Sequence, residues 1–158
     1  MKSILSTLLL LLPILIGAAC DQVAPLPADG NENYIDENTD SMSDTLIIKV
    51  GGKEFTATLL DNPTATAFKA MLPLTINMTD LNRNEKYYRL SESLPTNASN
   101  PSTINSGDLM LWGSNTVVIF YETFSTSYSY TKLGKINNPT GLSGALGSGD
   151  AIVTIELE

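Results

Sequence analysis

Short runs in which apolar and polar residues alternate, each bounded by turn-forming residues, dominate the chain from residue 45 to its end. The segments 53–60, KEFTATLL, and 151–157, AIVTIEL, have this alternation most clearly. Because successive side chains of a strand point to opposite faces of its sheet, the pattern predicts strands that each bury one face. Many short strands with only two short helices favour a mainly β domain, a closed antiparallel β-barrel, since closure leaves no exposed edge strand.

Turn and helix signals divide residues 45–158 into expected elements. Gly51-Gly52, between two runs of β-forming residues, predicts a hairpin. Asp61-Asn62-Pro63 predicts a helix start, because a capping residue precedes a proline suited to the first turn, and Pro73 predicts the helix end. The other expected elements are strands over 74–78, 87–90, 108–112, 116–121, 123–131, 133–136 and 151–157, a short helix over 139–146, and polar connections over 79–86 and 91–106.

Residues 1–19 are typical of a bacterial export signal. Lys2 is basic, residues 4–16 are almost wholly apolar, and residues 17–19 are the small residues Gly-Ala-Ala. The apolar run is shorter than the roughly 20 residues that a membrane-spanning helix needs, and Pro13 interrupts it. We therefore expect residues 1–19 to be a cleaved signal peptide rather than a permanent membrane span.

Cys20, the only cysteine of the chain, follows these small residues directly. The arrangement resembles a lipobox, in which the cysteine sulfur receives diacylglycerol and becomes the mature N-terminus. The resemblance implies a lipoprotein that is exported from the cytoplasm and anchored to a membrane of the cell envelope, because attached acyl chains hold a protein on a bilayer. An ordinary cleaved signal followed by a free cysteine is the alternative.

A sharp change of composition separates this N-terminal region from the expected barrel. Residues 21–44 include seven acidic residues and no basic ones, with almost no apolar periodicity. Like charges and low hydrophobicity prevent a packed core, so the sequence predicts a flexible tether. The expected organisation is a signal peptide over 1–19, a lipidated cysteine and acidic tether over 20–44, and a β-barrel domain over 45–158.

The absence of histidine and the net charge of −8 restrict the chemistry of the chain. Without imidazole, this chain alone cannot form a Ser-His-Asp or Cys-His catalytic system or a histidine-ligated zinc site. Net negative charge opposes binding to nucleic acid, whose phosphates are contacted mainly by Lys and Arg. We therefore expect no metal, no cofactor and no nucleic-acid partner.

Aromatic residues interleaved with hydroxyl residues predict a ligand site in the second half of the domain. Rings supply contact area and hydroxyl groups supply direction in sites for small molecules, glycans or peptides. The alternative is that several of these rings fill the barrel interior. The candidate ligand-binding residues are Tyr88, Arg89, Trp112, Tyr121, Phe124, Thr126 and Tyr128.

Several segments resemble the cyclophilins. Residues 59–71, LLDNPTATAFKAM, are similar to the strand-to-helix segment of that family. Residues 133–136, LGKI, followed by 141–146, GLSGAL, and the last strand resemble the cyclophilin ending, and Gly107-Asp108 is similar to a Gly-Asp step between the two. The strings resemble the small bacterial cyclophilin-like proteins of uncertain function more closely than the true prolyl isomerases. The resemblance implies a cyclophilin-like β-barrel with two short helices.

The resemblance also raises the question of catalysis. In cyclophilins an arginine in a Phe-x-Arg context is thought to hydrogen-bond the prolyl nitrogen, which lowers an isomerisation barrier of roughly 18–20 kcal/mol. Residues 87–89, Tyr-Tyr-Arg, are the only similar string here, which makes Arg89 the catalytic candidate, although a surface strand residue beside Tyr88 is the plainer interpretation. The glutamine-rich and Asn-Gly-Thr-Gly-Gly segments that follow such an arginine in the family are absent.

We therefore expect a monomeric binding module without catalytic activity, whose ligand is a small molecule, glycan or peptide. A peptidyl-prolyl cis-trans isomerase or chaperone for exported proteins is the alternative function. A purely structural envelope protein is a third. The position of Arg89 relative to an apolar surface distinguishes the first two.

Overall fold

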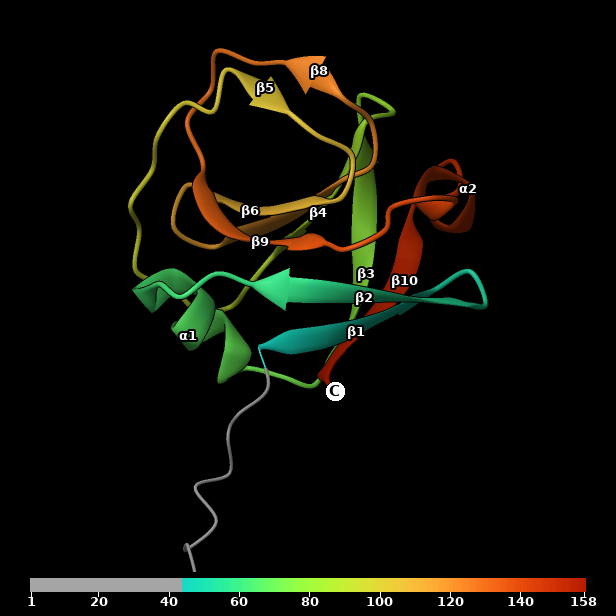
Figure 1. Ribbon diagram of the computed structural model, residues 1–158, viewed down its shortest axis with the longest axis horizontal. Helices are drawn as coiled ribbons and strands as arrows, with labels where there is room; N and C mark the ends of the chain where they lie inside the picture. The colour runs from blue at the N-terminus through green and yellow to red at the C-terminus, as the bar shows by residue number, and fades with distance from the viewer. Residues whose placement is uncertain (1–43) are drawn as a thin grey trace, which may run out of the picture. The chain divides into compact units, whose positions relative to one another are not determined.

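A computed structural model describes residues 44–158, which contain a closed barrel of antiparallel strands (Figure 1). Around the barrel the strands follow the order β1-β10-β3-β4-β7-β6-β9-β2, and β2 pairs with β1 to close it. The predicted mainly β fold, a closed antiparallel barrel with two short helices, is confirmed. The elements are β1 (Thr45–Val50), β2 (Lys53–Leu59), α1 (Pro63–Lys69), β3 (Leu74–Leu81), β4 (Glu85–Arg89), β5 (Thr103–Ile104), β6 (Asp108–Trp112), β7 (Thr116–Phe120), β8 (Phe124–Ser125), β9 (Thr131–Ile136), α2 (Leu142–Leu146) and β10 (Ala151–Leu157).

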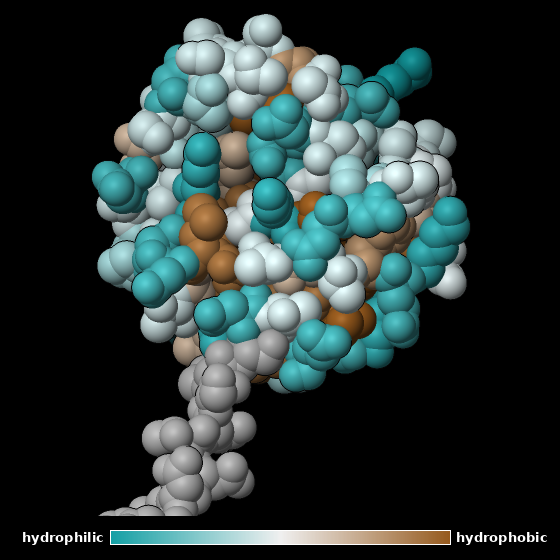
Figure 2. Space-filling view, viewed as in Figure 1, coloured by the Kyte–Doolittle hydropathy of each residue, from teal (hydrophilic) through white to brown (hydrophobic). Residues whose placement is uncertain are grey.

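The predicted signal peptide, the lipidation of Cys20 and nearly all of the acidic tether fall outside the described residues. Within residues 44–158, no helix is long and apolar enough to cross a membrane. On the face of the molecule in Figure 2, hydrophilic side chains surround small, separate apolar areas. Scattered apolar residues of this kind are ordinary on a protein surface, so this face gives no sign of a large docking patch.

The β1–β2 hairpin forms as the two glycines predict. Val50 pairs with Lys53, so Gly51 and Gly52 make a two-residue turn, with φ values of 57° and 73°. Both values lie in the left-handed region that favours glycine and that suits the twist of a tight hairpin. A Cβ on Gly51 would lie 2.3 Å from the backbone oxygen of Ala145, so the turn also packs closely against helix α2.

The two helices lie at opposite ends of the barrel (Figure 1). Helix α1 begins after Asn62, whose side-chain oxygen accepts a hydrogen bond of 2.8 Å from the backbone amide of Ala65. This cap, with proline at the start of the helix, is the arrangement that the sequence signal predicts. Phe68 of α1 and the two leucines of α2 are buried in the core of the barrel, which explains why each helix is held against its end.

The main core fills the interior of the barrel with the inward-facing residues that alternate along its strands. Alternation in the sequence therefore becomes burial on one face, and the removal of apolar surface from water stabilises the closed sheet. Strand residues of this core include Leu46, Ile48, Phe55, Leu59, Ile76, Met78, Leu109, Leu111, Val117, Ile119, Leu133, Ile136, Val153 and Ile155.

Strand β7 differs from the other strands because both of its faces are buried. All of its residues, TVVIF, are buried, a run typical of a strand that is covered on two sides. Val117 and Ile119 belong to the interior core, whereas Val118 and Phe120 face the outer wall of the barrel. There they join an outer cluster that comprises Ile104, Met110, Val118, Phe120 and Tyr130, with Tyr87 and Phe124 packed against it. The β5-β8 sheet supplies two of these residues, so it covers this part of the wall (Figure 1).

The β3–β4 hairpin is longer than the sequence predicts. Strand β3 continues to Leu81 and β4 begins at Glu85, so the expected polar connection over 79–86 is mostly strand. The reason is cross-strand pairing, because Leu81 lies opposite Glu85 and the two strands stay paired up to the turn. No apolar alternation in the sequence predicts this pairing. Helix α1 also ends earlier than expected, at Lys69 rather than close to Pro73.

The predicted strand over 123–131 is wrong. Strand β8 covers only Phe124–Ser125, and β9 does not begin until Thr131. Between them the chain runs outside the barrel, where Phe124 and Tyr130 pack on the outer cluster while Tyr128 is exposed. The alternation of aromatic and polar residues here therefore arises because two rings attach a loop to the outer cluster, not because the segment pairs as one continuous strand.

Candidate functional site

A cavity of about 520 Å³ lies on the outer wall of the barrel, above β4 and β7 and beneath the segment 124–130. Three stretches of chain that are far apart in the sequence supply its walls: the β3–β4 hairpin, the ends of β6 and β7, and the segment from β8 to β9. The lining residues are Leu81, Asn82, Asn84, Glu85, Tyr87, Arg89, Trp112, Thr116, Val118, Phe124, Ser125, Thr126, Ser127, Tyr128 and Tyr130.

Strand β4 builds one wall of the cavity because its side chains alternate between the two faces of the barrel. Glu85, Tyr87 and Arg89 all line the cavity. Between them, the side chain of Lys86 is completely buried, and Tyr88 packs against the interior core. The period of two along the strand thus places an acid, a phenol and a guanidinium in a row along the cavity wall.

The opposite wall is held in place by rings. The ring of Phe124 lies 5.8 Å from that of Phe120, and the ring of Tyr130 lies 5.4 Å from the same ring in an edge-to-face arrangement. Backbone bonds add to this, since the Thr126 amide donates to the oxygen of Ser102 at 3.0 Å. The hydroxyl-bearing stretch 125–127 is therefore held over the cavity at both of its ends.

The rim of the cavity carries large side chains that are poorly covered by the protein. Trp112 is 49 % exposed, Tyr128 is 66 % exposed and Leu81 is 43 % exposed. Exposed rings around a concave site can close on a ligand and gain buried area. Trp112 is also the only tryptophan of the chain, so its fluorescence reports on this cavity directly.

The electrostatic character of the cavity is set by Glu85. Burial raises the pKa of the Glu85 carboxyl to about 7. No ion pair involves this carboxylate within the described residues, so nothing there offsets the loss of hydration. Burial, followed by the charge of Glu85, raises the pKa of Tyr130 above its ordinary value. Both side chains line the cavity.

Five of the seven predicted ligand-binding residues line this cavity: Arg89, Trp112, Phe124, Thr126 and Tyr128. The structure does not bring Tyr88 or Tyr121 to it. The side chain of Tyr88 lies on the inward-facing side of β4 and packs against the interior core. Tyr121 follows the end of β7 and is only 6 % exposed.

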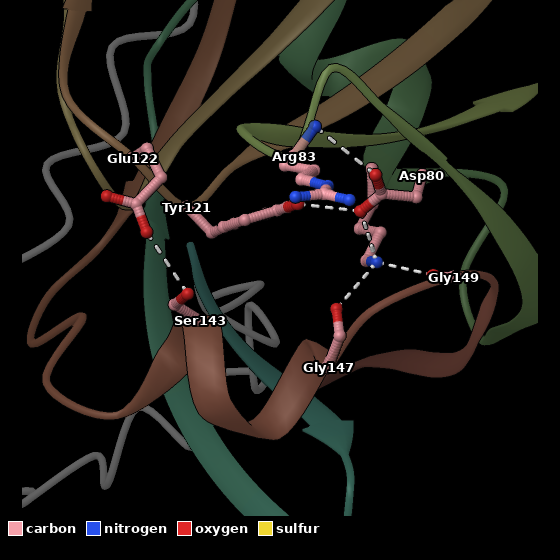
Figure 3. A network of polar contacts seen from close by, with 8 residues as sticks. Asp80, Arg83, Tyr121, Glu122, Ser143, Gly147 and Gly149 are labelled. Atoms are coloured by element: carbon pink, nitrogen blue, oxygen red, sulfur yellow. Dashed lines mark hydrogen bonds and ion pairs between the residues drawn. The ribbon is translucent and has the colours of Figure 1, made fainter.

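Tyr121 instead belongs to a polar network at one end of the barrel (Figure 3). Its hydroxyl donates to Asp80 at 2.6 Å, and the ammonium group of Lys86 donates to the same carboxylate oxygen at 2.6 Å. Lys86 also donates to the backbone oxygens of Gly147, at 2.9 Å, and Gly149. The hydrogen bond from Lys86, followed by that from Tyr121, lowers the pKa of Asp80 below its ordinary value. The ammonium group of Lys86 thus has three acceptors within the described part of the protein, which is typical of a structural network.

Sequence reasoning missed the cavity residues Asn84, Glu85 and Tyr87. Asn84 and Glu85 lie in the stretch expected to be a polar connection, and only the strand pairing of β4 reveals which side chains face outward. The sequence did hold a signal for two of these residues. Glu85 and Tyr87 lie four and two positions before Arg89, so in a strand their side chains face the same side as that of Arg89.

A second, smaller cavity of about 260 Å³ lies near the start of α1. It is lined by Asn62, Pro63, Thr64, Pro95, Thr96, Asn97, Ser99, Thr131 and Lys132, none of which is aromatic. Thr64 already donates to the oxygen of Pro95 at 2.7 Å, so part of its polar lining is occupied by the protein itself. The larger cavity is therefore the better candidate for ligand binding.

Comparisons with known proteins agree with this architecture. The sequence model of the Cyclophilin-like family matches residues 48–156. The solution structure of a hypothetical protein from Archaeoglobus fulgidus has a TM-score of 0.56 and 18 % sequence identity, covering 74 % of this chain and 96 % of that chain, and this likeness concerns the fold. No curated protein matches. The family match covers the barrel from its first strand to its last, and the chain therefore belongs to the cyclophilin-like family.

Proposed function

We propose that this protein is a monomeric envelope lipoprotein whose cyclophilin-like domain binds a small molecule, glycan or peptide without altering it covalently. The observation that carries the proposal is the cavity of about 520 Å³ between the barrel wall and the segment 124–130. Its volume falls within the roughly 300–1,000 Å³ of ordinary ligand pockets. Its lining combines rings, hydroxyls and only two charged groups, Glu85 and Arg89, as recognition of a small polar ligand requires.

Binding without covalent chemistry is supported by the residues that line the cavity. Within the described residues, no group of three or more His, Cys, Asp or Glu side chains is placed to hold a metal ion. The lining has no cysteine or lysine, and its serine and threonine residues have no imidazole beside them because the chain has no histidine. The cavity is thus supplied with groups for recognition rather than with an activated nucleophile.

Ligand binding is tested by titrating the full chain with a disaccharide, a proline-containing tetrapeptide and 2-phenylethanol, while Trp112 fluorescence is recorded. We expect at least one probe to change the emission saturably, and Tyr128→Ala to weaken that response. Ile152→Ala is the matched control, because Ile152 is equally exposed, at 69 %, but does not line the cavity. No saturable response to any probe, or equal weakening by both variants, contradicts the proposal.

The envelope location rests on the sequence of residues 1–44 and needs its own test. We expect mass spectrometry of the mature protein from its bacterial host to find an N-terminal Cys20 that carries diacylglycerol. Cys20→Ser should leave the protein unlipidated. A mature N-terminus at another residue, or an unmodified Cys20 thiol, contradicts the lipoprotein assignment.

Peptidyl-prolyl isomerisation is the second candidate, because Arg89 lines the same cavity as the apolar side chains of Val118 and Phe124. By resemblance to the cyclophilins, such an arginine would hydrogen-bond the prolyl nitrogen above an apolar surface. The measurement is the isomerisation rate of a proline-containing peptide with the full chain and with Arg89→Ala. Acceleration that is lost in Arg89→Ala replaces the binding-only proposal, whereas no acceleration by the unsubstituted chain removes the isomerase candidate.

A further inference from the structure

We propose that the ligand of the large cavity carries a cationic nitrogen, such as a primary ammonium group, that binds the carboxylate of Glu85. This inference rests on the proposed binding function and specifies the chemistry of its ligand. It is carried by an acidic group that the described part of the protein leaves without a cation, and by the rings around it.

The acceptor is the carboxylate of Glu85. It is half-buried at the start of β4 and lines the cavity, opposite Leu81 on β3 and Phe120 on β7. A carboxylate in such apolar surroundings is costly to ionise, and within residues 44–158 no cation pairs with it. A ligand cation would supply the missing partner.

The adjacent residue, Asn84, also lines the cavity but offers no acceptor to a ligand there. Its side-chain oxygen is buried out of reach of solvent, and its carbonyl oxygen already accepts from the amides of Tyr121, at 2.9 Å, and Glu122, at 3.3 Å. Of these two neighbours, only Glu85 can therefore receive a ligand cation.

The rings of the cavity favour a donor that is also positively charged. Tyr87 neighbours Glu85 on the same face of β4, and Tyr130 also lines the cavity. Aromatic faces attract ammonium groups, most strongly where water is excluded. A carboxylate and aromatic rings together form a site that selects an amine over a neutral alcohol and rejects an anion.

Arg89 does not neutralise this site from within. It is the only cationic residue among those that line the cavity, and it lies four residues further along β4. At about 3.3 Å per residue, the two Cα atoms are separated by roughly 13 Å. No ion pair links Arg89 to Glu85 among the described residues.

Binding of an amine should depend on pH through Glu85. The charged and titratable groups around it are Asp80 and Arg83 in the β3–β4 hairpin, Lys86, Tyr87 and Arg89 on its own strand, Glu122 after β7, and Tyr128 and Tyr130 across the cavity. Asp80 and Lys86 bind each other at the inner side of the wall. Ordinary amines and tyrosines titrate near pH 10, so Glu85 is the group that changes charge between about pH 5.5 and 8.

The sign follows from the charged form that the cation needs. Burial raises the pKa of Glu85 to about 7, so the carboxyl is mostly protonated at pH 5.5 and mostly ionised at pH 8. An ammonium ligand binds the ionised carboxylate of Glu85. At low pH the carboxyl must therefore lose its proton before the ligand can bind. Affinity should therefore fall roughly thirtyfold from pH 8 to about pH 5.5.

The experiment compares 2-phenylethylamine, 2-phenylethanol and phenylacetate, which share one ring and differ in charge, by Trp112 fluorescence titration of the full chain. We expect the amine to bind at least about tenfold more tightly than the alcohol at pH 8 and to lose that advantage in Glu85→Gln. Glu92→Gln, an exposed glutamate outside the cavity, should leave the advantage intact.

The possible results separate the two proposals. Equal binding of all three probes, or an amine preference that survives in Glu85→Gln, overturns the amine assignment but leaves the cavity as a binding site. Tighter binding of phenylacetate than of the amine also overturns it and assigns recognition to Arg89. Saturable binding of none of the three overturns the amine assignment and leaves the binding function to the disaccharide and tetrapeptide titrations.

Discussion

Asp80→Asn is the most informative perturbation of the fold, because it removes one charge and almost no volume from the network at the barrel end. Lys86 is completely buried and the side chain of Asp80 is 17 % exposed. Removing one partner of a buried ion pair usually destabilises a protein by about 3–5 kcal/mol, since the other charge stays buried. An asparagine oxygen still accepts one of the hydrogen bonds from Lys86 and Tyr121, so we expect a loss of about 3 kcal/mol at pH 7.

The assay is urea unfolding of the full chain, followed by circular dichroism at several pH values. In thermal unfolding of a domain of this size, about 3 kcal/mol corresponds to a fall in Tm of roughly 10–15 °C. The matched control is Glu54→Gln, because the ion pair of Glu54 with Lys49 spans 3.8 Å and both side chains are exposed. That variant should change the free energy of unfolding by less than about 1 kcal/mol.

The pH dependence provides an independent check. The folded state holds the pKa of Asp80 below its ordinary value of 3.8, chiefly through the hydrogen bond from Lys86. The stabilisation is therefore fully present above the unfolded pKa and disappears as the pH falls through the folded one. The difference between the two proteins should be constant above about pH 5 and shrink at lower pH. A loss under 1 kcal/mol at pH 7, or a difference that grows on acidification, would refute the reasoning.

Three further predictions concern single positions. Gly51→Ala should destabilise the protein by about 2 kcal/mol more than Gly52→Ala in urea unfolding. Both glycines have positive φ, but only Gly51 lies against the backbone of α2. Equal effects would show that the contact between Gly51 and α2 is unimportant. Asn62→Ala should reduce the free energy of unfolding by about 1 kcal/mol through loss of the helix cap, and Asn62→Asp should restore most of it. Folding raises the pKa of Glu85 to about 7, so the contribution of this residue to stability is present at acidic pH and is lost as the pH rises toward 7. Glu85→Gln should therefore be more stable than the unsubstituted protein at pH 8 and similar to it at pH 5. A less stable variant at pH 8 would indicate a partner for the carboxylate.

Much of the barrel could be predicted from residue patterns alone because the signals are local. Gly51-Gly52 sits in the hairpin turn, and Asn62-Pro63 caps and begins α1, where each needs only its nearest neighbours to take effect. The alternation over 151–157 becomes β10 with the bounds that the pattern predicts. The resemblance to the cyclophilins in segments 59–71, 133–136 and 141–146 then implied a cyclophilin-like barrel, and the family match confirms that family.

The candidate site could be predicted only in part. Trp112, Phe124, Thr126 and Tyr128 were found by residue type, because rings next to hydroxyls are typical of binding sites whatever the fold. Tyr121 has the same chemical character, but it lies at the barrel end and donates to Asp80, so residue type alone misplaced it. The expected strand over 123–131 failed for a related reason, since its alternation arises from anchoring on the outer cluster rather than from a ladder.

The sequence by itself determined that the chain is mainly β, that its domain has two short helices, and that imidazole chemistry is absent, because these properties depend on local patterns and composition. Only the tertiary structure decided which residues meet. Glu85 and Tyr130 are far apart in the chain, yet both line one cavity because β4 and β7 are neighbours in the barrel wall and the segment 124–130 folds back over them. Contacts of this kind follow from strand order and register, which no local pattern specifies.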